Sequence, residues 1–95
     1  MADTITKIIA WAQDRNLIDG ATSHAQMLKL IEEVGELAAA IARGNQDGIG
    51  DAVVVLAILA AQNGLRIEDC IDSAYNEIKD RKGQMVGGIF IKEAE

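Results

Sequence analysis

Proline is absent from the 95-residue chain, and its only aromatic residues are Trp11, Tyr75 and Phe90. Turn prolines and aromatic side chains are common in β-sandwiches, so both shortages count against an all-β fold. Nonetheless 49% of the residues are hydrophobic. A core of aliphatic side chains and many alanines is typical of closely packed helices.

Cysteine occurs once, as Cys70, so the chain cannot form an internal disulfide, and nothing marks a secreted disulfide scaffold. A basic-then-apolar leader is also lacking, and we expect no signal peptide. The longest apolar run, residues 52–61, has about half the length that a membrane-spanning helix needs. The sequence therefore predicts a cytoplasmic protein with no membrane partner.

Positive charge is scarce as well. Nine Lys and Arg residues oppose 15 Asp and Glu residues, for a net charge of −6. A general binder of nucleic-acid backbones would carry a basic face, so no nucleic-acid partner is expected. The length allows one domain, residues 1–95, and a chain this small and apolar cannot cover all its hydrophobic surface alone. We therefore predict a homodimer or a tetramer.

Apolar residues recur at helical spacing in four segments. These segments are residues 4–16, residues 23–43, a stretch that begins between Asp47 and Gly50 and ends before Gly64, and residues 67–82. The residues expected to begin or end the helices are Asp3 or Thr4, Ser23 with Gln26 as a capping box, Gly44, and Gly83.

The tail, residues 84–95, is expected to be extended, with two short strands about a turn at Gly87-Gly88. A lone hairpin of this size is marginal in water, so we expect it to dock on its own bundle or on a neighbour's. The predicted fold is all-α: an oligomeric four-helix bundle with a short C-terminal hairpin.

Charged and amide side chains share one arc of the second predicted helix. They are Gln26, Lys29, Glu32, Glu33 and Glu36. Apolar side chains occupy the opposite arc and are expected to face the core: Leu30, Ile31, Val34, Leu37, Ala38 and Ile41. The charged arc is open to two interpretations: the ordinary solvated face of an amphipathic helix, or part of a metal site.

The third predicted helix is apolar on all sides except at Asp51, so we expect it to be buried all round, within the subunit and against a partner, and to carry Asp51 inward. The connection between the second and third helices is short, so we expect them to be antiparallel neighbours. Asp51 and Glu36 can then lie at a similar height along the two helix axes. Carboxylates gathered there repel one another unless a cation intervenes. Oxygen ligands favour Mg²⁺ or Mn²⁺, and a di-iron site fails because the chain has no Glu-x-x-His pair.

Three stretches together resemble the MazG-like family of all-α nucleoside triphosphate pyrophosphohydrolases, in the short form found in phages and mobile elements. They are Glu32-Glu33-Val34-Gly35-Glu36-Leu37, Gly50-Asp51-Ala52-Val53-Val54-Val55-Leu56 and Tyr75-Asn76-Glu77-Ile78-Lys79-Asp80-Arg81-Lys82-Gly83. The resemblance extends from about Trp11 to Lys92. It implies cleavage of nucleoside triphosphates to monophosphate and pyrophosphate.

The resemblance also implies site residues. Glu33, Glu36 and Asp51 would bind Mg²⁺ or Mn²⁺, and Glu32 would be a further ligand or the base that orients water. The family's second motif is Glu-x-x-Asp, but Gly48 stands at its first acid. Asp47 either takes that place or only caps the third helix.

Each candidate substrate contact can also be interpreted as a residue with an ordinary structural role. Lys29, Lys79 and Lys82 are candidates for the outer phosphates; Lys79 and Lys82 otherwise only offset a helix dipole, which is the role assigned to Arg81. Asn76 binds sugar or phosphate, or is simply exposed, and Trp11 stacks on a base or packs in the core. His24 is expected to be solvated and Cys70 to lie in the core.

Gly48 also keeps a second function open. The alternative to an enzyme is a helical module of the same fold that senses nucleotides or binds a partner without catalysis.

Overall fold

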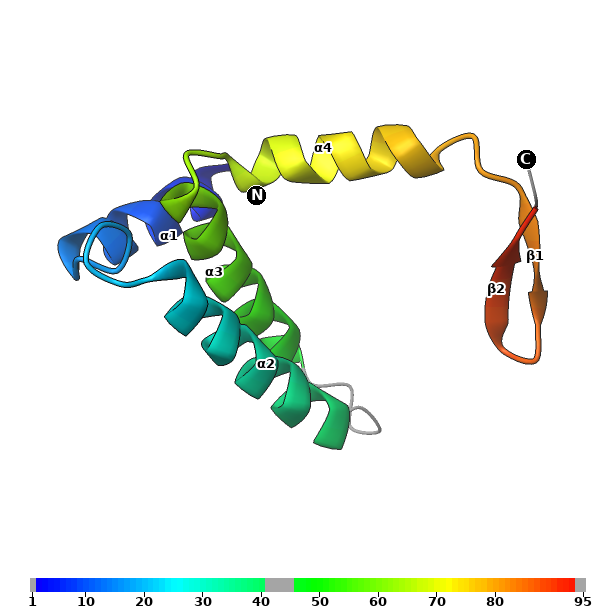
Figure 1. Cartoon of the computed structure of the whole chain (residues 1–95), viewed down its shortest axis with the longest axis horizontal. Helices are drawn as coiled ribbons and strands as arrows, with labels where there is room; N and C mark the ends of the chain where they lie inside the picture. Colours follow the sequence, from blue (N-terminus) through cyan, green and yellow to red (C-terminus); the bar gives the residue numbers. More distant parts are fainter. Residues whose placement is uncertain (1, 41–45, 94–95) are drawn as a thin grey trace.

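The computed structural model describes residues 2–40 and 46–93, and in this part of the chain four helices precede a two-stranded hairpin (Figure 1). The elements are α1 (Ala2–Asp14), α2 (Ser23–Ala39), α3 (Gln46–Gln62), α4 (Ile67–Ile78), β1 (Gly83–Val86) and β2 (Ile89–Lys92). The four predicted helices and the predicted hairpin are confirmed.

Several helix ends differ from the prediction. Asp3 and Thr4 lie inside α1, and Thr22 rather than Ser23 caps α2, because its hydroxyl accepts a hydrogen bond from the backbone N–H of Ala25 at 3.0 Å. The helix α2 ends at Ala39 instead of residue 43, and the predicted stop at Gly44 lies outside the described residues.

The helix α4 ends at Ile78, four residues before Lys82. The N–H of Arg81 bonds to the carbonyl of Ile78 at 2.9 Å, which tightens the chain into a turn, and Gly83 already pairs with Lys92 in the hairpin. The helix cannot continue through residues that the strand pairing requires to be extended.

The helix α3 organises the packing. Antiparallel α2 lies along one side of it and α1 crosses near its C-terminal end (Figure 1). Ile5, Ala57 and Ile67 form a buried cluster, against which Ile8 and Ile9 pack. The predicted pairing of α2 with α3 is confirmed.

Side-chain and backbone hydrogen bonds hold the two turns beside this cluster. The side-chain amide of Gln62 donates to the carbonyls of Leu17 at 3.2 Å and Ala21 at 3.0 Å, which fixes the α1–α2 loop on the end of α3. Gly64 adopts φ +70°, and the N–H of Leu65 bonds back to the carbonyl of Ala60 at 2.9 Å. This Schellman turn ends α3 where predicted.

After that turn the chain leaves the other helices. The axes of α3 and α4 differ by 102°, and every described residue from 69 to 93 is exposed, Cys70 included. The predicted bundle is therefore not closed within one chain, and the core position predicted for Cys70 is wrong. The Cα radius of gyration is 15.8 Å, whereas a compact domain of this length has about 12 Å.

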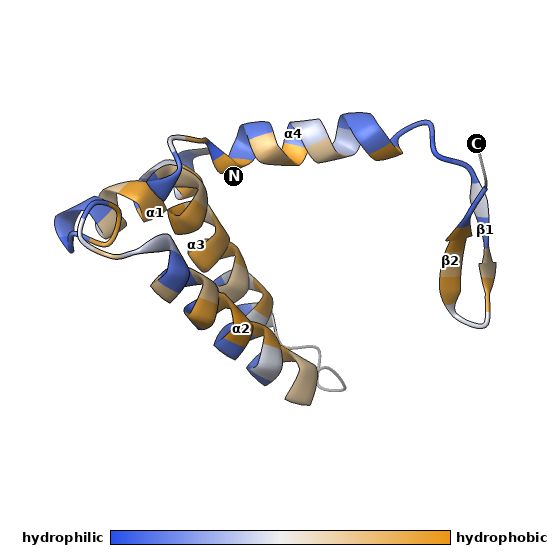
Figure 2. Cartoon of the chain, in the orientation of Figure 1, coloured by the Kyte–Doolittle hydropathy of each residue, from blue (hydrophilic) through white to orange (hydrophobic). Residues whose placement is uncertain are grey.

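The hairpin has the predicted turn. Gly87 and Gly88 both adopt positive φ (58° and 81°), as a two-residue hairpin turn with the twist of the strands requires, and Val86 pairs with Ile89. Figures 1 and 2 show its apolar strands standing apart from α1, α2 and α3. Docking on its own bundle, one of the two predicted places, is therefore wrong for the single chain.

Among the described residues no single helix is long and apolar enough to cross a membrane, and only α3 with α4 passes that test as a bent pair.

Candidate functional site

The stripe of α2 that faces α3 is of mixed character. Its inward residues are Gln26, Leu30, Glu33, Leu37 and Ala40. Glu33 is 9% exposed and is the one charged residue buried among the described residues. Ile31 and Val34, predicted to face the core, are instead exposed, with Ile31 at 62%. The prediction placed the most apolar arc of α2 inward, whereas the buried face of α2 includes Glu33.

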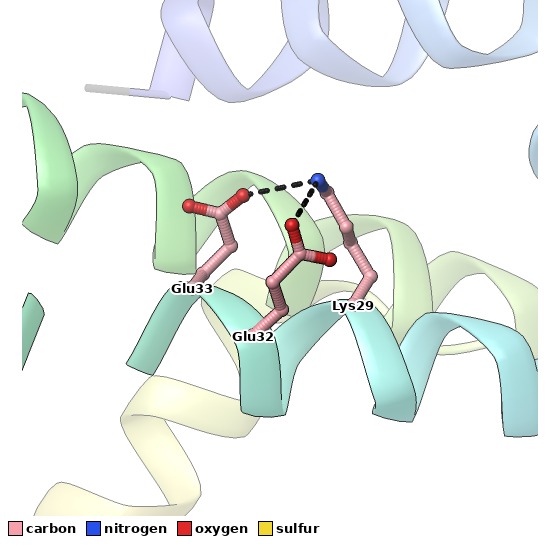
Figure 3. Close-up of polar contacts among 3 residues, drawn as sticks. All are labelled: Lys29, Glu32 and Glu33. Atoms are coloured by element: carbon pink, nitrogen blue, oxygen red, sulfur yellow. Dashed lines mark ion pairs between the residues drawn. The ribbon is translucent and has the colours of Figure 1, made fainter. Parts of the chain in front are cut away.

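Lys29 makes this burial tolerable. Its ammonium lies 3.2 Å from a carboxylate oxygen of Glu33 and 3.7 Å from one of Glu32 (Figure 3). The hydrogen bond with Glu33 raises the pKa of Lys29, and the charges of Glu32, Glu33 and Glu36 raise it further. The ammonium of Lys29 thus forms ion pairs with two carboxylates and is also attracted by the charge of a third.

The acidic start of α3 lies on the surface. Asp51 is exposed and does not point into the core of its own chain, and α3 is only partly buried within that chain. The burial of α3 against a partner stays a prediction. Its apolar side chains Ile49, Val53 and Leu56 are also exposed. Asp47 lies within the first turn of α3 and is exposed, whereas Gly48 is buried.

The predicted phosphate contacts lie far along the chain from this face. Asn76, Lys79 and Lys82 are exposed on α4 and just beyond it, and α4 leads away from α2 (Figure 1). One chain therefore does not bring these residues to the glutamates. Lys29 lies among the glutamates as predicted.

Trp11 is on the surface as well. Its side chain is 45% exposed, so it is not a core residue. The guanidinium of Arg15 lies 4.4 Å from the centre of its ring and also donates to the carbonyl of Trp11 at 3.1 Å. Arg15 was not among the residues predicted from the sequence, although a spacing of four residues on a helix is the signal that predicts such a contact. His24 is exposed, as predicted.

A family model described as the MazG nucleotide pyrophosphohydrolase domain matches residues 21–86. This chain belongs to the MazG family. The matched range begins just before α2 and ends with β1, so it contains the acidic face, Asp51 and the cations after α4. The resemblance seen in the sequence is thereby confirmed, and the family is one of nucleotide pyrophosphohydrolases.

A phage protein is also similar to this MazG chain. It is described as an uncharacterized 18.2 kDa protein in the rep-hol intergenic region of Haemophilus phage HP1 (strain HP1c1), and it is 46% identical over 63 residues. The match covers 62% of this chain and 39% of the phage protein, so the chain spans well under half of that relative. No solved structure matches the chain.

The carboxylates of this MazG chain suit a hard divalent cation by type but not by arrangement. Glu32, Glu33, Glu36, Asp47 and Asp51 all offer oxygen, the ligand that Mg²⁺ prefers. Within residues 2–40 and 46–93, however, no three His, Cys, Asp or Glu side chains are grouped closely enough to hold a metal ion. No metal site is therefore shown within these residues.

Proposed function

We propose that this MazG domain hydrolyses nucleoside triphosphates between the α and β phosphates, releasing a monophosphate and pyrophosphate with Mg²⁺ or Mn²⁺ as cofactor. The observation that carries the proposal is Glu33, buried and paired with Lys29 at 3.2 Å within the family's acidic motif. Burial of a carboxylate is costly, and α2 could have packed its apolar arc, with Ile31 and Val34, against α3 instead. A functional role for Glu33 accounts for this choice.

The proposed ligands are Glu33, Glu36 and Asp51, while Asp47 either takes the place of the acid missing at Gly48 or only caps α3. A bound divalent ion supplies charge at the phosphates and lowers the pKa of its water. Glu32 is proposed as a further ligand or as the base that orients the attacking water. Lys29 holds Glu32 and Glu33 in place while the ion is absent, as their separations of 3.7 and 3.2 Å support.

The proposed substrate contacts come from three places in the chain. Lys29 lies beside the carboxylates, whereas Lys79 and Lys82 belong to a basic stretch suited to the outer phosphates. Asn76 is proposed for the sugar or a phosphate, and the exposed ring of Trp11 for the base. A homodimer or tetramer is part of the proposal, because these residues do not meet within one chain.

A non-catalytic module that senses nucleotides or binds a partner is the second candidate. Gly48, which stands where the family motif has an acid, favours it, and Gly48 is buried. Such a module would bind a nucleotide with the same cations and would release no pyrophosphate.

The deciding experiment is an assay of pyrophosphate release from a panel of ribo- and deoxyribonucleoside triphosphates with Mg²⁺ or Mn²⁺, read as phosphate after added pyrophosphatase. Wild type is expected to turn over at least one nucleotide, and Glu36→Gln to lose activity by about a hundredfold or more. Asp14→Asn, which removes the same charge from an exposed position on α1, is the control and is expected to keep full activity.

The outcomes separate the two candidates. No release from any nucleotide, together with a higher melting temperature in the presence of nucleotide and Mg²⁺, favours the sensor. Full activity of Glu36→Gln contradicts the proposed site.

A further inference from the structure

The ammonium of Lys29 lies where the proposed ligands need a cation. It is 3.2 Å from a carboxylate oxygen of Glu33 and 3.7 Å from one of Glu32 (Figure 3). Glu33 is one of the proposed metal ligands, and Glu32 is proposed as a further ligand or as the base. Carboxylate oxygens that contact an ammonium are not free for a second cation. The chain therefore supplies its own cation at part of the proposed site.

The spacing of residues along α2 builds this contact into the helix. Lys29 stands three residues before Glu32 and four before Glu33, and side chains at these spacings lie on the same side of a helix. The helix contains no other lysine and no arginine, although it carries three glutamates. The remaining ion pair among the described residues joins Arg66 to Glu68, which lie outside α2. No other lysine or arginine of α2 can therefore take the place of Lys29.

The two partners of the closer ion pair differ in their freedom to move. The side chain of Glu33 is 11% exposed, whereas that of Lys29 is 49% exposed. Neighbouring side chains hold a buried carboxylate in place, but a half-exposed lysine can turn its amine into water while its stem stays on the helix. An ion pair of such a lysine adds little to stability. If the partner of Glu33 is exchanged, Lys29 therefore moves and Glu33 stays.

A divalent cation and an ammonium cannot share one carboxylate oxygen of Glu33. Mg²⁺ binds an oxygen at about 2.1 Å, whereas the ammonium of Lys29 lies 3.2 Å from its nearest oxygen. Two cations so close to each other repel, and the repulsion is stronger beside a buried group than in water. Binding of a divalent cation by Glu33 therefore includes the free-energy cost of releasing Lys29.

We propose that Lys29 is a competitor built into the site: its ammonium occupies the oxygens of Glu33 and Glu32 until a divalent cation takes them, and its amine then turns outward. Lys29 thereby weakens the binding of a divalent cation by this face of α2. Once released, it is available as the phosphate contact of the proposed function. The inference rests on the proposed function for the use of these carboxylates and adds the control of their occupancy.

A crosslink of zero length reports the contact without any assay of activity. A carbodiimide joins a lysine amine to a carboxylate in contact with it and takes up the water that is lost, and mass spectrometry identifies the linked residues. Wild type without divalent ions is expected to link Lys29 to Glu33 or Glu32. Mn²⁺ at about ten times its dissociation constant leaves about a tenth of the chains free of the ion, so the yield of this link should fall about tenfold.

Variants of Lys29 test the competition through the affinity for Mn²⁺, measured from the electron paramagnetic resonance signal of the free ion. Lys29→Gln removes the ammonium and should bind Mn²⁺ about three- to tenfold more tightly than wild type. Lys29→Arg keeps a cation within reach of both glutamates and should bind as wild type does. Lys92→Gln removes one positive charge from the hairpin, which stands apart from α2 (Figure 1), and should leave the affinity unchanged.

Three outcomes overturn the competition. The first is that wild type without divalent ions forms no link from Lys29 to Glu33 or Glu32. The second is that the yield of this link is unchanged when Mn²⁺ is bound. The third is that wild type and Lys29→Gln bind Mn²⁺ with equal affinity. The crosslinks use wild-type protein, so they decide the matter even where a variant fails to fold.

These outcomes are distinct from failure of the proposed function. Equal affinities of wild type and Lys29→Gln, together with release of pyrophosphate by wild type, overturn the competition and leave the function intact. Tighter binding by Lys29→Gln, together with no release from any nucleotide, supports the competition and contradicts the function. Absence of Mn²⁺ binding from both proteins overturns the competition and also contradicts the proposed metal ligands.

Discussion

Lys29 partly neutralises the acidic face of α2, which consists of Glu32, Glu33 and Glu36. It contacts Glu32 and Glu33, and the nearby charge of Glu36 also acts on it. A cation that serves several carboxylates stabilises the helix while no metal is bound. On the proposed function, a divalent ion bound by the same oxygens would compete with the ammonium of Lys29 for them.

Replacement of Lys29 is expected to lower the melting temperature over a defined pH range. The pKa of Lys29 is raised above 10.5 in the folded chain, so its contribution to stability is fully present below pH 10.5 and is lost as the pH rises through the folded value. Lys29→Gln should therefore melt below wild type from pH 7 to 10, and the gap should close above pH 10.5. Thermal melts across this range measure it.

Lys7→Gln is the control, since it removes one charge from exposed α1. An equal loss in both variants would assign the effect to net charge instead of to the contacts with Glu32 and Glu33.

Asp47 and Asp51 are expected to respond differently to loss of charge. Asp47 lies in the first turn of α3, where a carboxylate favours the helix dipole by about 0.3–1 kcal/mol. Asp47→Asn should cost that much in free energy of unfolding and keep activity, whereas Asp51→Asn should keep stability and lose about a hundredfold or more in turnover. Denaturant melts and the pyrophosphate assay measure the two effects, and equal loss of activity would make Asp47 the replacement for the acid missing at Gly48.

At the scale of elements, α2 has apolar side chains both on the face toward α3 and on its exposed outer face. Its inner stripe packs Leu30, Glu33 and Leu37 toward α3, while Ile31 and Val34 lie on the outer face. Gly35 belongs to that outer face, and a Cβ added there meets no atom within 4 Å. A glycine inside a helix costs about 1 kcal/mol relative to alanine, and nothing in its own chain requires it.

Gly35→Ala is therefore a test of close packing on the outer face of α2. In an isolated chain it should raise stability by about 0.5–1 kcal/mol. Because we expect a second copy of the chain to cover this apolar face, the variant should instead lower the melting temperature and weaken the oligomer. Gly50→Ala, whose added Cβ also meets open space but lies on α3, is the matched control. Equal gains from both variants would contradict packing at Gly35.

At the scale of the whole molecule, one chain has too small a core for its apolar content. Among residues 2–40 and 46–93, the buried hydrophobic residues are Ile5, Ala12, Ala40, Val55, Ala57, Ile58 and Ile67, and three of these seven are alanines. The helix α4, the hairpin and the outer face of α2 expose larger side chains, such as Tyr75, Phe90 and Ile31. Association of chains would remove this apolar surface from water, which favours the predicted oligomer.

Light scattering at micromolar concentration is expected to give a mass of at least two chains of 10.2 kDa each. Ile31→Glu places a charge on the outer face of α2 and should shift the mass toward one chain, because burial of an unpaired charge opposes association. Gln13→Glu, on an exposed position of α1, should leave the mass unchanged. A wild-type particle of 10.2 kDa would contradict the predicted oligomer.

Local spacing and turn chemistry were sufficient for the elements and for the family. The recurrence of Ile5, Ile8 and Ile9 predicts an α-helix whichever partner it meets, and Gly87-Gly88 predicts the hairpin because positive φ at two successive residues suits glycine. The acidic motif and the start of α3 identified the MazG family for the same reason, since both are short patterns along the chain. These properties depend on residues within a few positions of one another.

The tertiary structure alone decided which face of α2 is buried, where Asp51 points and where α4 goes. A helical wheel places Glu33 and Ile31 on different arcs, but the contact with α3 determines which arc is inside, and the pairing with Lys29 lets Glu33 take that place. Likewise, the turn at Gly64 directs α4 away from α2, so Lys79 and Lys82 do not join the glutamates of their own chain. Such outcomes depend on contacts between residues distant in sequence, whose free energies local patterns do not contain.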